Sequence, residues 1–162
     1  MTDRLTPDKL APMNSPANWN QILADILESF GCQTGTIHQA APGNRILKLV
    51  CQIGVPESLM DKISTIPFGK GIAGAAAERG EAVKLCNLQQ DLGGVAKIDA
   101  RQTGVSGSLA VPVFATGTDR VVGTLGIGKM APHQYSDAEE RRLEELAREI
   151  AELFRNNEAR GD

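Results

Sequence analysis

Two pairs of strand-like segments, each pair joined by a tight turn, constrain the fold of this sequence more than any other feature. The first pair spans residues 34–40 and 45–54, with the turn sequence APGN between them. The second pair lies within residues 108–129, around the turn sequence ATGTD. Because a short turn joins antiparallel neighbours, the two hairpins predict an antiparallel sheet and exclude a doubly wound parallel one.

An amphipathic helix is predicted near residues 16–30. Its apolar positions recur at helical spacing and end before Gly31. The pair Ser15-Pro16 is typical of a helix N-terminus, because serine caps the first turn and proline suits the first helical position. The apolar positions are Trp19, Ile22, Leu23, Ile26, Leu27 and Phe30.

A second amphipathic helix is predicted near residues 136–156, where Ser136 and Glu139 form a capping box. One apolar face of each terminal helix would cover the sheet. Because both helices are apolar over more than a single contact line, we also expect a homodimer that buries part of them. The stripe of the last helix contains Leu143, Leu146, Ala147, Ile150, Leu153 and Phe154, and the charged residues expected beside the seam are Glu144, Glu145, Arg148 and Arg155.

Between the two hairpins, the sequence predicts short elements and one long loop. A short helix is expected near residues 56–63, and a helix of about two turns from Gly71 to Arg79, ending at Gly80. Residues 82–85 predict a short strand. Residues 88–107 have no regular period and therefore predict a loop that carries a helical turn or two.

Length and composition indicate one soluble α/β (α+β) domain. We expect a flexible tail at residues 1–14, the domain at residues 15–157 and a short tail at residues 158–162. The net charge of −3 and the lack of a basic arm argue against nucleic acid binding. The sequence shows neither an apolar run long enough to span a membrane nor a signal peptide, so a cytoplasmic protein is expected.

The three cysteines do not suggest a metal site. Cys32, Cys51 and Cys86 are widely separated and have no zinc-type spacing with either histidine. Cys51 lies within an apolar strand pattern, which favours a buried structural thiol, and we expect the same of Cys86. No metal ion and no cofactor are therefore predicted.

Two glycine-rich segments resemble phosphate-binding loops without meeting their requirements. Residues 69–74 have the spacing GxGxxG, but Pro67 lies where a central strand would need its N–H group. Residues 123–129 resemble a P-loop, but Met130 replaces the hydroxyl residue that would hold magnesium. We interpret the first segment as a turn whose glycines let a helix lie close to a sheet.

Three segments together resemble the GAF domain family. They are IPFGKGIAGAAAERGEAVKLCNL, GVSGSLAVPVF and RVVGTLGIGKMAPHQYSDAEERRLEELAREIAELF, and the resemblance begins near residue 16. It implies a PAS-like antiparallel sheet, with the terminal helices on one face and a small-molecule pocket on the other. In that family the glycine-rich segment opens a helix beside the pocket. Fold alone does not determine the chemistry, so the residues of each subfamily must be compared separately.

The segment IPFGKG at residues 66–71 also resembles the free methionine-(R)-sulfoxide reductases of this family. Their reaction requires cysteine thiolates. Alignment on this segment places the three reductase cysteines at Ile63, Ala73 and Arg101. The pocket acids of the reductases align with Ser108, Gly126 and Gly128. The resemblance therefore implies the scaffold of the enzyme without its reactive groups.

Three hypotheses for the function follow. The first is a non-catalytic sensory domain that binds a small molecule and acts through dimer or partner protein contacts. The second is a divergent sulfoxide reductase-like enzyme, and the third is a ligand-free dimerisation module. The pocket is expected between the sheet and residues 91–108, with the helix from Gly71 as one wall. Its candidate ligand-binding residues are Phe68, Ile72, Asp91, Asp99, Arg101, Thr103, Ser106 and Ser108.

Overall fold

A single antiparallel sheet of six strands forms the centre of the molecule. The computed structural model describes residues 18–43, 45–85 and 106–159. The strand order is β3-β2-β1-β6-β5-β4, and every neighbouring pair is antiparallel. Both predicted hairpins are confirmed. The strands are β1 (Thr34–Ala40), β2 (Ile46–Ile53), β3 (Thr65–Pro67), β4 (Val83–Leu85), β5 (Gly107–Phe114) and β6 (Val121–Lys129).

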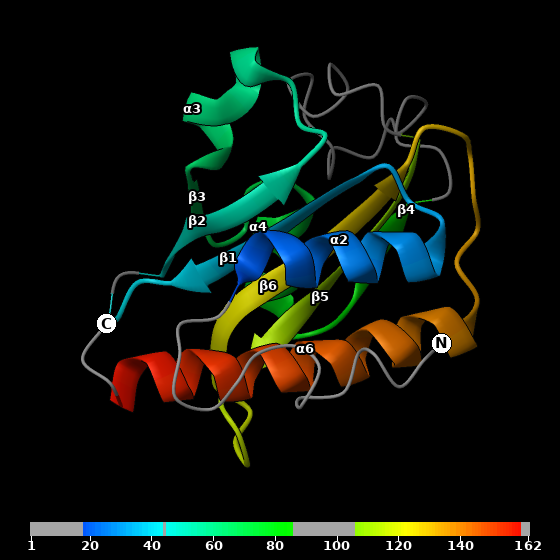
Figure 1. Ribbon diagram of the computed structural model, residues 1–162. Coiled ribbons are helices and arrows are strands. Elements are labelled where there is room, and N and C mark those ends of the chain that lie inside the picture. The colour runs from blue at the N-terminus through cyan, green and yellow to red at the C-terminus, as the bar shows by residue number, and fades with distance from the viewer. Residues whose placement is uncertain (1–17, 44, 86–105, 160–162) are drawn as a thin grey trace.

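The terminal helices cover one face of this sheet, and a shorter helix lies on the other face. Figure 1 shows α2 and α6 in front of the strands and α4 behind them. This arrangement confirms the predicted α+β architecture. The helices are α2 (Trp19–Phe30), α3 (Met60–Ile63, preceded by a 3₁₀ turn at Glu57–Leu59), α4 (Gly71–Arg79) and α6 (Asp137–Ala159). Within the described residues, no helix is both long and apolar enough to cross a bilayer.

Helix α2 begins later than the sequence predicted. Asn18 has a non-helical backbone, and its side-chain oxygen accepts a hydrogen bond from the Gln21 backbone N–H at 3.2 Å. This is the geometry of an N-cap, so Asn18 caps the helix in place of Ser15. The predicted end is confirmed, because Gly31 adopts the left-handed conformation that closes the helix.

The start of α6 confirms the predicted capping box. The Glu139 backbone N–H donates to Ser136 Oγ at 3.1 Å, and the Ser136 backbone N–H donates to Glu139 Oε1 at 2.8 Å. Two N–H groups that the helix itself cannot satisfy are thereby paired. His133 also contacts the Glu139 carboxylate, at 3.1 Å, so this glutamate joins the loop before α6 to its first turn.

The apolar faces of α2 and α6 are buried within a single chain. Every apolar stripe residue predicted on α6 is less than 9% exposed, and on α2 only Trp19 is more exposed than that. Trp19 packs against the same core. Surplus apolar surface on these helices was the reason to expect a dimer through them, and the structure removes that reason. Among the described residues, Met130 is the one large exposed apolar side chain.

Small residues bring α4 close to the other face of the sheet. A β-carbon added at Gly74 would lie 2.6 Å from the Pro67 carbonyl oxygen, so no larger residue fits there. Gly69 and Gly71 have positive φ angles of 91° and 68°, which glycine tolerates best. The GxGxxG segment is therefore a close-packed turn into α4, as predicted, and Pro67 lies on the edge strand β3.

Candidate functional site

The α4-side face of the sheet carries two buried polar side chains next to one another. His38 on β1 lies directly opposite Thr124 on β6, and each is only 1% exposed. Directly opposed residues of antiparallel strands extend from the same face of the sheet. His38 Nδ1 and Thr124 Oγ1 are both buried, and neither has a hydrogen-bond partner. Buried polar atoms normally have one, so this pair is the candidate contact site for a water or a small molecule.

The local contacts of His38 define its protonation. Its Nε2 lies 2.9 Å from the Ile63 carbonyl oxygen at the end of α3, so this nitrogen carries the proton that it donates. Burial lowers the pKa of His38, against the opposing effect of the Ile63 carbonyl. The ring is therefore neutral near pH 7, and Nδ1 is a free acceptor. Beside it, the Thr124 hydroxyl can either donate or accept.

The positions that hold acids in the sulfoxide reductases also lie together on β5 and β6. Ser108 is opposite Gly128, and Ala110 is opposite Gly126. Thr36 on β1 is opposite Gly126 on its other side, and an added β-carbon at Gly126 would lie 3.3 Å from Thr36 Oγ1. This part of the face thus presents hydroxyl groups and glycines. No carboxylate is available at these three positions to pair with the ammonium group of an amino acid.

The structure describes four of the predicted site residues, which are Phe68, Ile72, Ser106 and Ser108. Ser106 is buried, and its backbone N–H donates to the Lys129 carbonyl at 2.8 Å. Ser108 follows it on β5, whereas Ile72 on α4 packs against a small cluster with Ala75, Ala76, Val83 and Ala110. The remaining candidates, Asp91, Asp99, Arg101 and Thr103, lie outside the described residues, as does most of the expected pocket segment.

Phe68 belongs to a different part of the surface from Ser108. It lines an open cleft of about 520 Å³ together with Gln39 and Ala40, at the end of β1. Ser108 lies near the opposite end of that strand, because its partner Gly128 is also opposite Thr34. The Arg45 guanidinium stacks 5.0 Å above the Phe68 ring and pairs with Glu78, so this aromatic side chain already has a partner within the chain.

The described cysteines are not activated thiols. Burial raises the pKa of Cys32, although contact with the Tyr135 hydroxyl at 3.6 Å opposes this shift. Burial alone raises the pKa of Cys51 to about 11. Both groups are protonated at neutral pH and are therefore poor nucleophiles. Ile63 and Ala73, which align with reductase cysteines, lie in α3 and α4. Cys86 and Arg101 are outside the described residues.

Sequence reasoning did not identify His38 or Thr124. Both lie in segments that were correctly predicted as strands, and both alternate with core residues, Ile37 and Leu125. A polar side chain between apolar neighbours in a strand usually faces solvent, so these two residues gave no signal in one sequence. The signal that could have identified them is the central position of β1 and β6 in the sheet. Both faces of a central strand are covered, so a polar side chain there is buried on either face. No group of three or more metal-ligating side chains occurs within the described residues.

Comparison with known proteins agrees with this geometry. Residues 19–155 match the family model of the GAF domain. The chain belongs to the GAF domain family. This family comprises sensory and regulatory domains, most of them without enzymatic activity, and the resemblance stated from sequence is thereby confirmed. A search of curated proteins found no match to this GAF domain.

Solved structures show the same GAF fold at low sequence identity. The GAF domain of a phosphoenolpyruvate-protein phosphotransferase from Coxiella burnetii has a TM-score of 0.77 and 20% identity, over 98% of this chain and 93% of that one. The free methionine-R-sulfoxide reductase of Neisseria meningitidis, in complex with its substrate, has a TM-score of 0.71 and 20% identity. The match covers 98% of this chain and 83% of the reductase. The reductase of Staphylococcus aureus has a TM-score of 0.66 and 18% identity. The match covers 93% of this chain and 90% of that reductase.

Proposed function

We propose that this GAF domain is a non-catalytic sensory module that binds a small molecule on the α4-side face of its sheet. The observation that carries the proposal is the pair of unpartnered polar atoms, His38 Nδ1 and Thr124 Oγ1, on neighbouring strands. An unsatisfied buried polar group destabilises the fold by about 1–3 kcal/mol. A ligand that hydrogen-bonds to both atoms removes this cost, and the free energy recovered adds to its affinity.

The ligand suited to this pair is neutral and carries a hydrogen-bond donor. Nδ1 of the neutral His38 ring can only accept a hydrogen bond, and the Thr124 hydroxyl accommodates either an acceptor or a donor. A hydroxyl or amide group would therefore bond to both. A free amino acid is disfavoured, because Ser108, Gly126 and Gly128 provide no carboxylate for its ammonium group.

A reductase-like activity is the second candidate, supported by the structural likeness to free methionine-R-sulfoxide reductases. The raised pKa values of Cys32 and Cys51 oppose it, as do Ile63 and Ala73 at two aligned cysteine positions. A ligand-free interaction module is the third candidate. It would leave the His38 and Thr124 atoms paired only with water, so the binding experiment below separates it from the first.

We further propose that the domain works in the cytoplasm and passes its signal to a partner protein or to a second copy of itself. The homodimer remains a prediction, and it would have to use surface other than the buried stripes of α2 and α6. Light scattering at two protein concentrations tenfold apart tests it. A constant mass of 17.3 kDa, that of one chain, would contradict self-association.

Native mass spectrometry of the purified protein, before and after a chase with a panel of neutral amides and alcohols, tests ligand binding. We expect an adduct with wild-type protein that is lost in Thr124→Val, which removes the hydroxyl with little change in volume. Ser29→Ala is the matched control, because Ser29 bonds only to its own helix, at the Ile26 carbonyl. Absence of any adduct, or equal binding to Thr124→Val, would overturn the proposal.

A further inference from the structure

Gly126 lies in the interior of β6, a central strand, and is partly exposed. Glycine weakens the interior of a strand, so a glycine at such a position needs a reason. The φ angle of Gly126 is not positive, so the backbone conformation does not require it. The pairing of β6 with β1 and β5 is regular at this residue, so it is not part of a bulge.

Side-chain packing does not require this glycine either. Apart from its chain neighbours, a β-carbon added at Gly126 would meet Thr36 Oγ1 at 3.3 Å and the Leu109 carbonyl oxygen at 3.9 Å. By contrast, a β-carbon added at Gly123 in the same strand would lie 2.3 Å from the His38 carbonyl oxygen. Packing thus explains Gly123 but not Gly126. A strand glycine of the second kind often marks the close approach of a ligand.

Two short side chains border Gly126. Thr36 on β1 and Ala110 on β5 are directly opposite it, one on each side. Neighbouring strands are about 4.8 Å apart, so these two side chains stand about 10 Å apart with peptide backbone between them. We call this surface the Gly126 depression. A flat ring can contact its backbone floor over a whole face, whereas a puckered ring or a branched chain contacts it at fewer atoms.

The polar pair of His38 and Thr124 lies at one end of the Gly126 depression. Thr124 precedes Gly126 by two residues, so the two positions are on the same face, about 6.6 Å apart. His38 and Thr124 are each 1% exposed, and His38 Nδ1 and Thr124 Oγ1 have no hydrogen-bond partner. A carboxamide suits both atoms, because its N–H can donate to His38 Nδ1 and its carbonyl can accept from the Thr124 hydroxyl.

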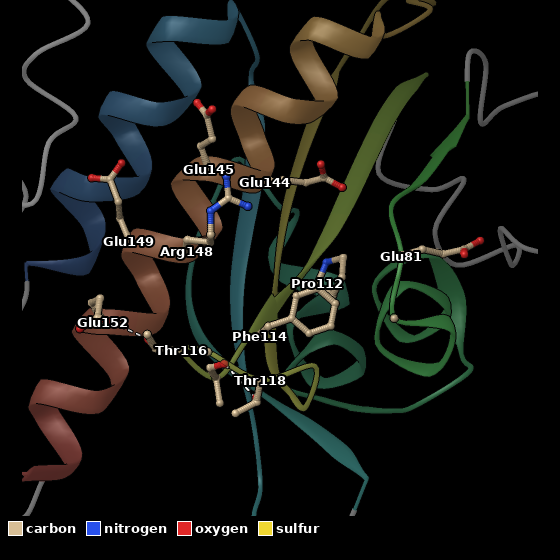
Figure 2. Close-up of a pocket in the computed structure, with 13 residues that line it drawn as sticks. Glu81, Pro112, Phe114, Thr116, Thr118, Glu144, Glu145, Arg148, Glu149 and Glu152 are labelled. Carbon is tan, nitrogen blue, oxygen red and sulfur yellow. Dashed lines mark hydrogen bonds between the residues drawn. The ribbon is translucent and has the colours of Figure 1, made fainter.

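Pro112 on β5 covers another side of this pair. It is directly opposite Thr124 and is buried. Figure 2 shows Pro112 beside Phe114, where both line a surface groove of about 650 Å³. Because Pro112 stands between that groove and Thr124, the groove does not lead to the polar pair. Of the two surfaces, the Gly126 depression is therefore the one that is open to it.

We propose that the ligand is a flat, uncharged ring that carries a carboxamide. This inference rests on the proposed function and specifies the class of ligand. The ring lies against the backbone at Gly126, and the carboxamide reaches His38 and Thr124. A hydrogen bond of about 2.9 Å to Thr124 leaves about 3.7 Å to the centre of the ring, which is the reach of a carboxamide joined directly to a six-membered ring. Thr36 and Ala110 provide no counter-ion, so a charged ring is disfavoured.

NMR titration of the full chain with three probes tests this class. Benzamide is the flat amide, cyclohexanecarboxamide carries the same amide on a puckered ring, and benzoate carries a charge on the flat ring. We expect benzamide to bind at least tenfold more tightly than either of the others. Equal binding of cyclohexanecarboxamide would show that flatness is not selected, and equal binding of benzoate would show that charge is not disfavoured. Either result would overturn this inference.

The panel of amides and alcohols separates this inference from the proposed function. Binding of an aliphatic amide or alcohol, without binding of benzamide, would overturn the flat ring and leave the sensory ligand site intact. Absence of binding by every member of the panel and by all three probes would overturn both proposals.

Matched variants test the position of the ring. We expect Gly126→Ala to weaken benzamide binding at least tenfold, because the added methyl group occupies the depression. Its Tm should equal or exceed that of the wild type, since the backbone and the space permit alanine there. Gly123→Ala is the reference for a glycine that packing requires and should have a lower Tm.

Ala138→Ser is the binding control, because it adds one atom at an exposed position of α6, on the other side of the sheet, and should leave benzamide binding unchanged. Unchanged benzamide binding by Gly126→Ala would overturn the placement of the ring. A Tm of Gly126→Ala as low as that of Gly123→Ala would show that packing requires Gly126, and would also overturn it.

Discussion

The Trp19 ring at the start of α2 packs against the Phe154 ring near the end of α6, with 5.4 Å between the ring centroids. Phe154 is only 3% exposed, and an added β-carbon at Gly123 would lie 2.9 Å from its ring. The two terminal helices therefore meet over β6 at a contact that also requires a glycine in the strand. This contact joins residues 135 positions apart in the sequence.

We expect Phe154→Ala to lower the free energy of unfolding by about 3–5 kcal/mol, because it leaves a cavity in this contact. Urea denaturation followed by circular dichroism gives the measurement. Phe114→Ala is the control, since Phe114 is only half-buried and should show a clearly smaller loss. Similar losses for the two variants would contradict the packing described for Phe154.

Thr124→Val should not destabilise the ligand-free domain. The Thr124 hydroxyl is buried without a partner, so its removal is expected to change the free energy of unfolding by about 1 kcal/mol or less, in the stabilising direction. Chemical denaturation of protein freed of small molecules by refolding provides the check. A loss of stability well above this size would mean that the hydroxyl already has a bond within the chain.

The stability of the domain should depend on Glu149 between about pH 4.5 and 7. Its pKa is raised to about 7 in the folded protein, so the carboxyl prefers to be protonated there. The unfolded state loses this proton at lower pH, and the folded state is therefore progressively disfavoured as pH rises through this interval. The raised pKa comes first from burial and then from the charge of the neighbouring Glu145.

Glu149→Gln removes this titration, so its Tm should exceed that of the wild type at pH 8 and match it near pH 4. Differential scanning fluorimetry across this range makes the comparison, with Glu57→Gln as the exposed control. A Tm difference that is constant across the range would rule out titration of Glu149 as its cause.

We expect no reduction of free methionine sulfoxide by the purified protein. The described thiols have raised pKa values, and two aligned cysteine positions hold Ile63 and Ala73. Thioredoxin-coupled oxidation of NADPH is the assay, with the substitution of all three cysteines by serine as the background. Turnover above that background would restore the reductase hypothesis.

Local patterns in the sequence predicted much of this fold. The hairpins, the capping box at Ser136 and the end of α4 at Gly80 depend on neighbouring residues, and all three are confirmed. The start of α2 was wrong, because Ser15 and Asn18 are both good capping residues and a pattern cannot choose between them. Edge strand β3 was also not assigned, since only three residues pair with β2.

The candidate sites were harder to predict than the fold. The pairing of His38 with Thr124 depends on the register between β1 and β6, which lie far apart in the sequence. This relationship leaves no periodic signal. The stripes of α2 and α6 show the reverse case, in which a clear pattern was interpreted too far. Their breadth was taken to indicate a partner molecule, but the sheet and the contact between the two helices are enough to bury them.

The sheet order has a consequence for how the domain forms. Strands β1 and β6, the first and last along the chain, are neighbours at the centre, so each half of the sequence contributes one side of a seam. Closing that seam requires a long loop of chain to become ordered, which is slow compared with forming either hairpin. His38 and Thr124 face one another across it. The proposed ligand site thus exists only after the slowest contacts are made, and a bound ligand would favour the completed domain over its separate halves.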